Sequence, residues 1–303
     1  MHGNSIWDDI RWQLRFGSSL IRLIIINIIV FIVINLLHLF AYIFQKEIGF
    51  DITEFLSLYA APERFVTHPW GILTYMFVHE SFWHILWNVL GLYWFGQIVQ
   101  DTIGKSKIIP IYLMGGIAGG LLYMLAFNTL PVFSTLTSTA FCFGASAAVM
   151  AIVLSAATIA PNYELLLFLI GPVKIKWIAL AYIILDLINI QHGNPGGHIA
   201  HLGGALFGFI YIRQLQRGTD LGKIYYLLSD FFSSLLQKKD KLRVAYKKKT
   251  ASANTKKSTE ALKKGANEQQ QERLNAILDK INRSSYDSLS KEEKEFLFKM
   301  SQE

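Results

Sequence analysis

The chain has 303 residues, of which 52% are apolar and only 17% are charged, and its mean hydropathy is +0.33. Soluble domains typically carry about 25% charged residues. This chain has too little charge to cover the surface of a soluble protein of its size, and it is too apolar to be disordered. The composition therefore excludes a purely soluble or disordered protein and predicts several membrane-spanning helices.

The net charge of +7 is concentrated in the last third of the chain. Residues 213–303 hold 20 Lys and Arg and 12 Asp and Glu, whereas residues 1–212 carry a net charge of −1. The basic character therefore belongs to a tail and gives no support to nucleic-acid binding. The single cysteine, Cys142, excludes an intrachain disulfide. We expect no cleavable signal peptide, because the first apolar run is long and lacks a small-residue cleavage site.

Six apolar segments are candidates for spanning helices, each of which needs about 20 residues. They are residues 20–44, 83–99, 108–127, 143–160, 175–190 and 199–212. Several are shorter than a full span, which suits helices that are buried in a bundle or cross only part of the membrane. The mixed segment 45–82 is too polar to span but partly apolar, so we expect a long loop in the membrane interface.

The basic residues of the loops predict the orientation of these spans. They flank the first span and fill the loops between spans two and three and between spans four and five: Arg11, Arg15, Arg22, Lys105, Lys107, Lys174 and Lys176. The other loops together carry only Lys46 and Arg64. Because cytoplasmic loops are enriched in Lys and Arg, the positive-inside rule places both termini in the cytoplasm of a multi-pass protein of the cell membrane.

The first part of the tail is an apolar stripe followed by a basic cluster. Within residues 221–237 one helical face carries Ile224, Leu227, Leu228, Phe231 and Leu235. We prefer an in-plane amphipathic helix to a seventh span, because the segment is short and contains two charges. The basic residues that follow are Lys238, Lys239, Lys241, Arg243 and Lys247–Lys249. They suit anionic lipid headgroups, and a solvated charged linker is the alternative.

The end of the chain has the pattern of a small helical hairpin. Residues 250–270 are polar and are expected to be a flexible linker. Leu274, Ile277, Leu278 and Ile281 then form one stripe. Ser290 with Glu293 is a capping-box pattern that opens a second helix.

Polar residues inside the predicted spans are the candidates for function. Four histidines and a serine lie near the outward ends of spans two, four and six: His79, His84, Ser146, His198 and His201. Such residues are costly in a membrane and often functional, although any one of them alone is more simply a structural hydrogen-bonding group. Their common depth favours a shared site.

His79 and His84 resemble a zinc motif only superficially. Their spacing is i, i+5, so on a continuous helix the two rings point about 140° apart. One metal ion cannot easily take both as ligands, and we expect no metal. His84 and Asn88, in contrast, are i, i+4 and share a face, which suits two donors aimed at a developing negative charge.

Small residues predict a close contact between spans four and six. Ser146 begins span four among glycine and alanine, and span six places His201, Gly204 and Gly208 on one face. Gly204 and Gly208 form a GxxxG pattern, which lets helices approach closely. This contact would bring the Ser146 hydroxyl within hydrogen-bond reach of His201, as a nucleophile and base require.

Together these residues resemble the rhomboid intramembrane serine proteases over residues 16–217. The matching parts are the histidine segment of span two, the GxS start of span four at Gly144 and Ser146, and the sequence around His201. Further similar features are His68-Pro69-Trp70, the run Thr74–Phe77 and the glycines of span three, Gly115, Gly116, Gly119 and Gly120.

The resemblance implies an all-α membrane protein with a six-helix rhomboid-like bundle and a small helical cytoplasmic tail. It implies Ser146 as the nucleophile and His201 as the general base, a dyad, with His84, Asn88 and the backbone N–H of Ser146 stabilising the oxyanion. His79 would be structural. The implied substrates are single-span membrane proteins cut in or near their transmembrane segment, and no metal or organic cofactor is implied.

Two residues depart from the family pattern, and a third polar group is a separate question. Ala147 stands where a second glycine is usual, and its methyl group could crowd the contact with span six. Met150 stands where an aromatic residue usually stacks on the histidine, and a thioether packs less rigidly. Asp186, near the outer end of span five, is expected to be an interfacial capping or solvated carboxylate, with a place in the site as the alternative.

The expected organisation is a flank at 1–19, a six-span domain at 20–217, an amphipathic and polybasic segment at 218–249, a linker at 250–270 and a hairpin at 271–303. An active protease is the favoured function. A rhomboid-like protein that binds transmembrane segments without cutting them, for trafficking or quality control, is the alternative. A solute transporter is disfavoured, because there is no internal repeat.

Overall fold

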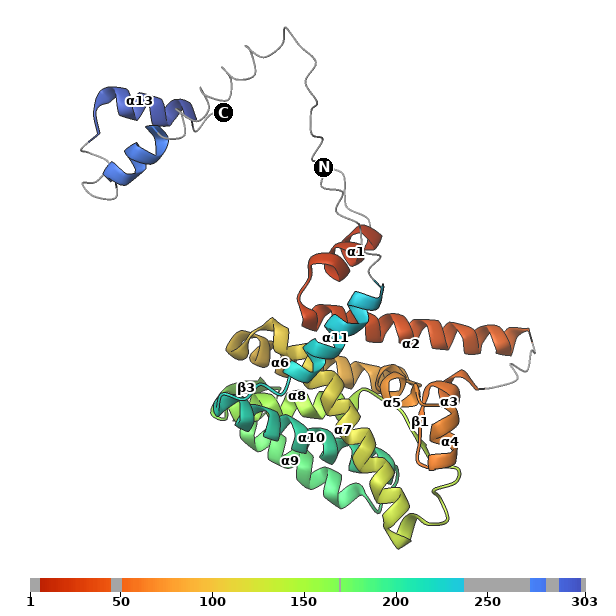
Figure 1. Cartoon of the computed structure of the whole chain (residues 1–303). Coiled ribbons are helices and arrows are strands. Elements are labelled where there is room, and N and C mark those ends of the chain that lie inside the picture. The colour runs from red at the N-terminus through yellow and green to blue at the C-terminus, as the bar shows by residue number, and fades with distance from the viewer. Residues whose placement is uncertain (1–5, 45–50, 169, 237–272, 282–288, 301–303) are drawn as a thin grey trace. The chain divides into compact units, whose positions relative to one another are not determined.

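The computed structural model describes residues 6–44, 51–168, 170–236, 273–281 and 289–300. The chain divides into two compact units, residues 1–238 and 239–303. The described part of the first unit is predominantly helical and includes two small two-stranded sheets (Figure 1).

Each of the six apolar segments forms a helix. The helices are α2 (Ser19–Ile43), α6 (Phe82–Ile103), α7 (Ile108–Thr129), α8 (Ser146–Ile159), α9 (Ile175–Asn189) and α10 (Pro195–Gln216). They are preceded by α1 (Ile6–Phe16) and followed by α11 (Lys223–Leu236). The side-chain oxygens of Ser18, Ser81 and Asn194 cap α2, α6 and α10, because each accepts a hydrogen bond from a backbone N–H of the first turn. These caps explain where the helices begin.

Hydropathy by itself identifies only part of this set. Among the described residues, two helical segments are both long and apolar enough to cross a membrane, Ser19–Ile43 and Lys105–Thr129. α6 and α10 are equally long at 22 residues each, but the first carries polar side chains and the second many glycines. α8 is strongly apolar but has 14 residues, a length of about 21 Å against about 30 Å of hydrocarbon in a typical bilayer.

The short helix α8 is the core of the first unit. Every residue from Ala147 to Ala157 is buried, and the helix packs against α6, α7, α9 and α10 (Figure 1). Glycines on the neighbouring helices make this contact close. A Cβ atom added to Gly204 or Gly208 of α10 would overlap the carbonyl oxygen of Ala147 or Ala151. The predicted glycine-mediated contact between these two helices is therefore confirmed.

The segment between α2 and α6 folds compactly where a long loop was expected. Its elements are α3 (Ile52–Leu56), β1 (Leu58–Tyr59), α4 (Pro62–Thr67), α5 (Gly71–Thr74) and the 3₁₀ turn η1 (Tyr75–Phe77). Strand β1 pairs antiparallel with β2 (Phe141–Cys142). The backbone N–H of Gly144 donates to the Tyr75 carbonyl oxygen at 2.9 Å. This segment therefore supports the stretch of chain that leads into α8.

A hairpin between α8 and α9 was not predicted. Strand β3 (Glu164–Leu167) pairs antiparallel with β4 (Gly171–Lys174), with Glu164 opposite Lys174. The run from Leu165 to Val173 is almost continuously apolar, so it lacks the alternation that identifies a strand in sequence. Two further short turns in the described part of this unit are η2 (Lys105–Lys107) and η3 (Pro131–Phe133).

The amphipathic segment after α10 is helical, as predicted, and is α11. The described members of its apolar stripe are exposed: Ile224, Leu227, Leu228 and Phe231. Its base is attached to the bundle, since Asp220 accepts hydrogen bonds from Lys107 Nζ at 2.5 Å and from the Tyr211 hydroxyl at 2.9 Å. The basic cluster from Lys238 and the expected linker at 250–270 lie outside the described residues.

The second unit contains the two helices that the apolar stripes predicted. Residues 273–281 are helical, and α13 covers Lys291–Met300. The capping box is confirmed: the Ser290 N–H donates to the Glu293 carboxylate at 2.7 Å, and the Glu293 N–H donates to the Ser290 hydroxyl at 3.3 Å.

Candidate active site

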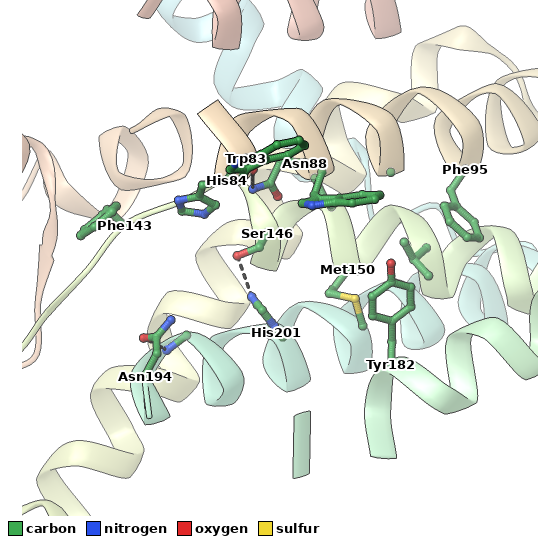
Figure 2. Close-up of a pocket in the computed structure, with 15 residues that line it drawn as sticks. Trp83, His84, Asn88, Phe95, Phe143, Ser146, Met150, Tyr182, Asn194 and His201 are labelled. Carbon is green, nitrogen blue, oxygen red and sulfur yellow. Dashed lines mark hydrogen bonds between the residues drawn. The ribbon is translucent and has the colours of Figure 1, made fainter. Parts of the chain in front are cut away.

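The side chains of Ser146 and His201 meet between α8 and α10. Ser146 is the first residue of α8, and its Oγ lies 2.6 Å from Nε2 of His201 (Figure 2). The glycines of α10 explain this distance, because Gly204 and Gly208 lie on the same face as His201 and press against the backbone of α8. The contact predicted from helical spacing is present.

These two residues line a cavity of about 400 Å³. Its walls are mainly aromatic and aliphatic, with a few polar groups among them, the composition typical of a substrate pocket. The polar lining residues are His84, Asn88, Ser146, Asn194 and His201, and the apolar ones include Trp83, Trp87, Phe143, Met150 and Tyr182. In Figure 2, Ser146 lies between His201 of α10 and the pair His84 and Asn88 of α6.

His84 reaches the site because Gly144 has no side chain. Gly144 adopts a φ of +124°, a conformation that favours glycine, and a Cβ atom there would lie 2.8 Å from Nε2 of His84. The glycine of the GxS sequence therefore satisfies two requirements, a backbone turn and the close approach of an imidazole. The turn and the missing side chain at Gly144 together allow the His84 ring to lie beside the N-terminus of α8.

Asn88 lines the same cavity and is 7% exposed. One N–H of its amide donates to the His84 carbonyl oxygen at 2.9 Å, within α6. That bond leaves the second N–H of the amide for a bound group. The two residues expected to share a face of α6 therefore both lie at the cavity, with Asn88 held in place by its own helix.

The N-terminus of α8 adds backbone donors. Ala145 is the residue that precedes the helix. Its carbonyl oxygen accepts a hydrogen bond from the N–H of Val149, one turn later. The amides of the first turn, including that of Ser146, have no carbonyl within the helix to bond. They are available to an anion at the cavity, and the helix dipole favours negative charge at this end.

His79 lies beside the site but does not share a helix with His84. α6 begins at Phe82, so the assumption of a continuous helix through both histidines was wrong. The His79 ring is fully buried, packs edge-on against the His84 ring at 4.9 Å between centroids, and contacts the Phe77 carbonyl oxygen through Nδ1 at 3.2 Å. Burial, and secondarily the nearby His84, lowers the pKa of His79 to about 4. His79 is therefore neutral at pH 7.

The structure places both residues that depart from the family pattern, and it accommodates Ala147. The side chain of Ala147 faces α7, where Gly119 makes room for it: a Cβ atom on Gly119 would lie 2.7 Å from the Ala147 methyl group. The methyl group therefore does not crowd the contact with α10, which is made by the Ala147 carbonyl. Met150 is 5% exposed and lines the cavity one turn beyond Ser146.

Asp186 is buried against the imidazoles of His201 and His198, so the expectation of a solvated carboxylate was wrong and the alternative, a place in the site, agrees with the structure. It is 6% exposed, and its Oδ1 lies 2.8 Å from Nδ1 of His201 and 2.8 Å from Nδ1 of His198. The sequence did contain a signal for it. Asp186 is the one acidic residue of the apolar segment 175–190, and an intramembrane carboxylate is a functional candidate by default.

The three groups Asp186, His198 and His201 also bring together donor atoms of the types that bind metals, within 4.8 Å of one another. The spacing within the cluster is that of hydrogen bonds. Ligand atoms about 2.0–2.1 Å from a tetrahedral zinc ion stand about 3.3 Å apart, whereas both carboxylate–imidazole distances here are 2.8 Å. The arrangement therefore fits two imidazoles sharing a carboxylate oxygen better than a ligand set.

Comparison with known proteins gives the family. The model of the Rhomboid domain matches residues 66–217, half of the chain. RHOMBOID-like protein 12, mitochondrial, of Arabidopsis thaliana is 30% identical over 156 residues, which cover 48% of this chain and 46% of that protein. Rhomboid protein 1, mitochondrial, of Saccharomyces cerevisiae is 28% identical over 167 residues, which cover 52% and 45%.

A bacterial relative is matched over more of its length. Rhomboid protease GlpG of Haemophilus influenzae is 28% identical over 167 residues, which cover 55% of this chain and 80% of that protein. The chain spans about half the length of the two mitochondrial relatives. The matched domain and the predominantly helical structure fit an all-α membrane protein. The chain belongs to the rhomboid family.

Proposed function

We propose that this protein is an intramembrane serine endopeptidase that cleaves other membrane proteins in or near a single transmembrane segment. Ser146 is the nucleophile and His201 the general base. The observation that carries the proposal is the 2.6 Å contact between Ser146 Oγ and His201 Nε2 inside a cavity of about 400 Å³. A relative from Haemophilus influenzae that is named a rhomboid protease supports proteolysis as the reaction.

The proposed reaction follows the acyl-enzyme route. Ser146 Oγ attacks the carbonyl carbon of the scissile peptide bond while His201 Nε2 takes the hydroxyl proton. The negative charge forms on the carbonyl oxygen, within reach of His84, Asn88 and the backbone N–H of Ser146. His201 then returns the proton to the leaving amine as the peptide bond breaks. Water, activated by the same imidazole, hydrolyses the ester and regenerates Ser146.

Six spans and the depth of the site form part of the proposal. α2 and α6–α10 are its six spans, and α8 is too short to cross a typical hydrocarbon layer by itself. Because Ser146 starts α8, a bundle centred on this helix holds the nucleophile below the membrane surface. The cavity at the N-terminus of α8 then supplies the water that hydrolysis needs.

We propose that both ends of the chain face the side of the membrane that carries the basic loops. Lys105, Lys107, Lys174 and Lys176 lie at the ends of helices opposite to the end that holds Ser146. The mitochondrial names of two relatives give no support to the cell membrane expected from the sequence. We therefore propose how the protein is oriented in its membrane without naming that membrane. The site opens on the side away from these lysines.

The test is labelling of the full chain in detergent by a fluorophosphonate, which reacts with activated serines. We expect labelling of the wild-type protein and none of Ser146→Ala. Ser155→Ala is the matched control, because Ser155 is a buried serine of the same helix whose hydroxyl donates to the Gly208 carbonyl oxygen at 3.2 Å. Equal labelling of the wild type and Ser146→Ala would overturn the assignment.

Cleavage separates the protease from the alternative of a non-cutting protein that binds transmembrane segments. The full chain and a model single-span protein are reconstituted together in liposomes. The protease hypothesis expects a cleaved substrate with the wild type and an intact one with Ser146→Ala. Binding of the substrate without cleavage by the wild type would favour the alternative.

The tail is proposed to lie on the membrane surface through α11. Its exposed side chains Ile224, Leu227 and Leu228 suit an apolar surface, and the basic sequence from Lys238 suits anionic headgroups. Cysteine substitutions test this in liposomes with a membrane-impermeant maleimide, since native Cys142 is buried. We expect Leu227→Cys to be protected and Asp230→Cys, off the stripe, to be labelled. Equal labelling of the two would contradict the proposal.

A further inference from the structure

We propose that Asp186 is a positioning residue for His201. The hydrogen bond between Ser146 and His201 is then part of a chain of hydrogen bonds that continues from His201 to Asp186 and from Asp186 to His198. The inference rests on the proposed function, because it assigns His201 the part of general base. It departs from the dyad that the family resemblance implies. Its basis is the placement of a buried carboxylate behind the imidazole, on the side away from Ser146.

The geometry places Asp186 in direct contact with the far nitrogen of the base. His201 Nε2 lies 2.6 Å from Ser146 Oγ, and His201 Nδ1 lies 2.8 Å from Asp186 Oδ1. Both imidazole nitrogens are therefore occupied, one by the hydroxyl and one by the carboxylate. The three groups come from three helices, α8, α10 and α9, so only the packed bundle brings them together.

An ionised carboxylate decides which nitrogen of His201 carries the proton. A carboxylate accepts hydrogen bonds and does not donate, so the proton of neutral His201 lies on Nδ1. Nε2 then presents a lone pair to the Ser146 hydroxyl, which is the tautomer that a general base needs. When Nε2 takes the serine proton, the carboxylate lies beside the positive imidazolium ring and stabilises it.

The surroundings of Asp186 favour this assignment over a packing role. The residue is 6% exposed, and within the described part of the chain its hydrogen-bond partners are the two imidazoles. Its Oδ2 is buried and has no hydrogen-bond partner there. A buried carboxylate with an unsatisfied oxygen destabilises a fold. A residue that costs stability and contacts the base is better explained by the reaction than by packing.

His198 fixes the carboxylate in turn. His198 and His201 are i, i+3 on α10, so successive turns of one helix hold the same Asp186 Oδ1 from two directions. Two donors on one oxygen restrict rotation of the carboxylate. The carboxylate held in this way fixes the orientation of the His201 ring through its hydrogen bond to Nδ1.

The experiment compares the rate constant of fluorophosphonate labelling, and kcat and KM for a single-span substrate, in the wild type, Asp186→Asn and Asp220→Asn. Asparagine preserves the shape of the side chain and removes its charge. Asp220→Asn is the matched control. Asp220 is also an acidic residue, but it pairs with Lys107 at the end of the bundle opposite to Ser146. In the described part of the chain, other titratable groups at the site include His198 of α10, His84 of α6 and Tyr182 of α9, and all three are unchanged in these variants.

We expect Asp186→Asn to lower kcat and the labelling rate constant by about 10²-fold or more, with KM close to that of the wild type. Asp220→Asn should lower the unfolding temperature and leave the labelling rate constant of the folded protein unchanged. Histidine-selective ¹⁵N spectra supply a further readout, with His201 as the Nδ1–H tautomer in the wild type and a larger Nε2–H population in Asp186→Asn.

Three outcomes are separable. If Asp186→Asn keeps the wild-type kcat and labelling rate, the positioning role is wrong, whatever the stability of this variant. If the wild type itself neither labels nor cleaves, the proposed function fails, and the inference fails with it. A fall in kcat that accompanies an unchanged tautomer of His201 would also overturn the stated mechanism for Asp186.

Discussion

The Oγ atom of Ser146 and the Nε2 atom of His201 lie 2.6 Å apart although 55 positions separate the residues in the chain. Backbone contacts set this distance, because Gly204 and Gly208 of α10 press against the carbonyl oxygens of Ala147 and Ala151. A shift of α10 by one residue would move His201 by about 1.5 Å and rotate it by about 100°. The helix contact therefore decides whether the site exists.

A methyl group at Gly204 is expected to separate the two helices. The Cβ atom of Gly204→Ala would overlap a backbone oxygen, which cannot move as a flexible side chain can. We expect a loss of stability of about 3 kcal/mol and a large loss of fluorophosphonate labelling. Gly91→Ala is the stability control, since its Cβ atom would meet only the Val149 side chain, at 3.1 Å. Similar unfolding temperatures for the two variants would contradict this view of the interface.

Removal of the Asn88 amide is expected to reduce the rate without removing the nucleophile. Asn88→Ala takes one proposed donor from the oxyanion and leaves the Ser146–His201 contact intact. The expected fall in kcat is about 10²-fold, the usual effect of losing one such donor. Asn88→Asp tests the charge, because a carboxylate of the same shape would repel the oxyanion and should lower kcat at least as much. A wild-type kcat in Asn88→Ala would remove Asn88 from the mechanism.

The buried His79 predicts a loss of stability in mild acid. Its pKa is lowered to about 4 in the folded protein, first by burial and then by His84, whereas an unfolded histidine titrates near 6.5. Below about pH 6.5 the unfolded chain therefore binds the proton first, and folding stability falls until about pH 4, by up to about 1.4 kcal/mol per pH unit.

Unfolding midpoints of the wild type and His79→Gln at pH 7.5 and pH 4.5 measure this effect. Other groups titrate in both proteins, so the difference between them isolates His79. We expect the advantage of the wild type over His79→Gln to narrow or reverse at the lower pH. A difference that stays constant over this range would show that His79 is not titrating as a buried neutral group.

The Asp220–Lys107 pair predicts a pH dependence of the opposite kind. Burial alone would raise the pKa of the Asp220 carboxyl, but hydrogen bonds from Lys107, Tyr211 and the Gly222 N–H outweigh it and hold the pKa below its usual value. A lowered folded pKa stabilises the fold above the unfolded value, near 3.8, and this stabilisation is lost as the pH falls through the folded pKa.

Asp220→Asn should therefore unfold more easily than the wild type at pH 7, by about 1 kcal/mol, and lose this difference below the lowered pKa. Thermal unfolding at pH 7 and at the lowest pH that retains the fold compares the two proteins. Tyr211→Phe is a second variant, which removes one hydrogen bond to the same carboxylate and should give a smaller effect of the same sign. Equal stability of Asp220→Asn and the wild type at pH 7 would contradict the pair's contribution.

Periodicity located the helices because apolar segments and capping residues are local features. All six apolar segments form helices, and the capping box at Ser290 and Glu293 is present. The hairpin of β3 and β4 and the pairing of β1 with β2 were not predicted. The strands β3 and β4 lie in an almost continuous apolar run, which lacks the alternation of a strand. The strands β1 and β2 pair residues 58–59 with residues 141–142, and a local sequence pattern cannot predict a pairing over that distance.

The candidate site divides in the same way. The spacing of His201, Gly204 and Gly208 along α10 predicts which face of this helix meets α8, since three positions on one helix have fixed relative directions. The accommodation of Ala147 could not be predicted, because its methyl group faces Gly119 of a third helix. Asp186 was placed wrongly for a similar reason: its partners His198 and His201 lie on another helix, and its depth depends on how α9 packs.

Composition and spacing along single helices were enough to predict the apolar helices, the basic tail and the candidate residues for a serine hydrolase, because these are local features. The hydrogen bonds that join Ser146, His201 and Asp186, and the packing of His79 against His84 from outside α6, became visible only in the folded chain. Those relationships depend on the rotation and depth of separate helices, which are set by contacts between backbones rather than by any local pattern.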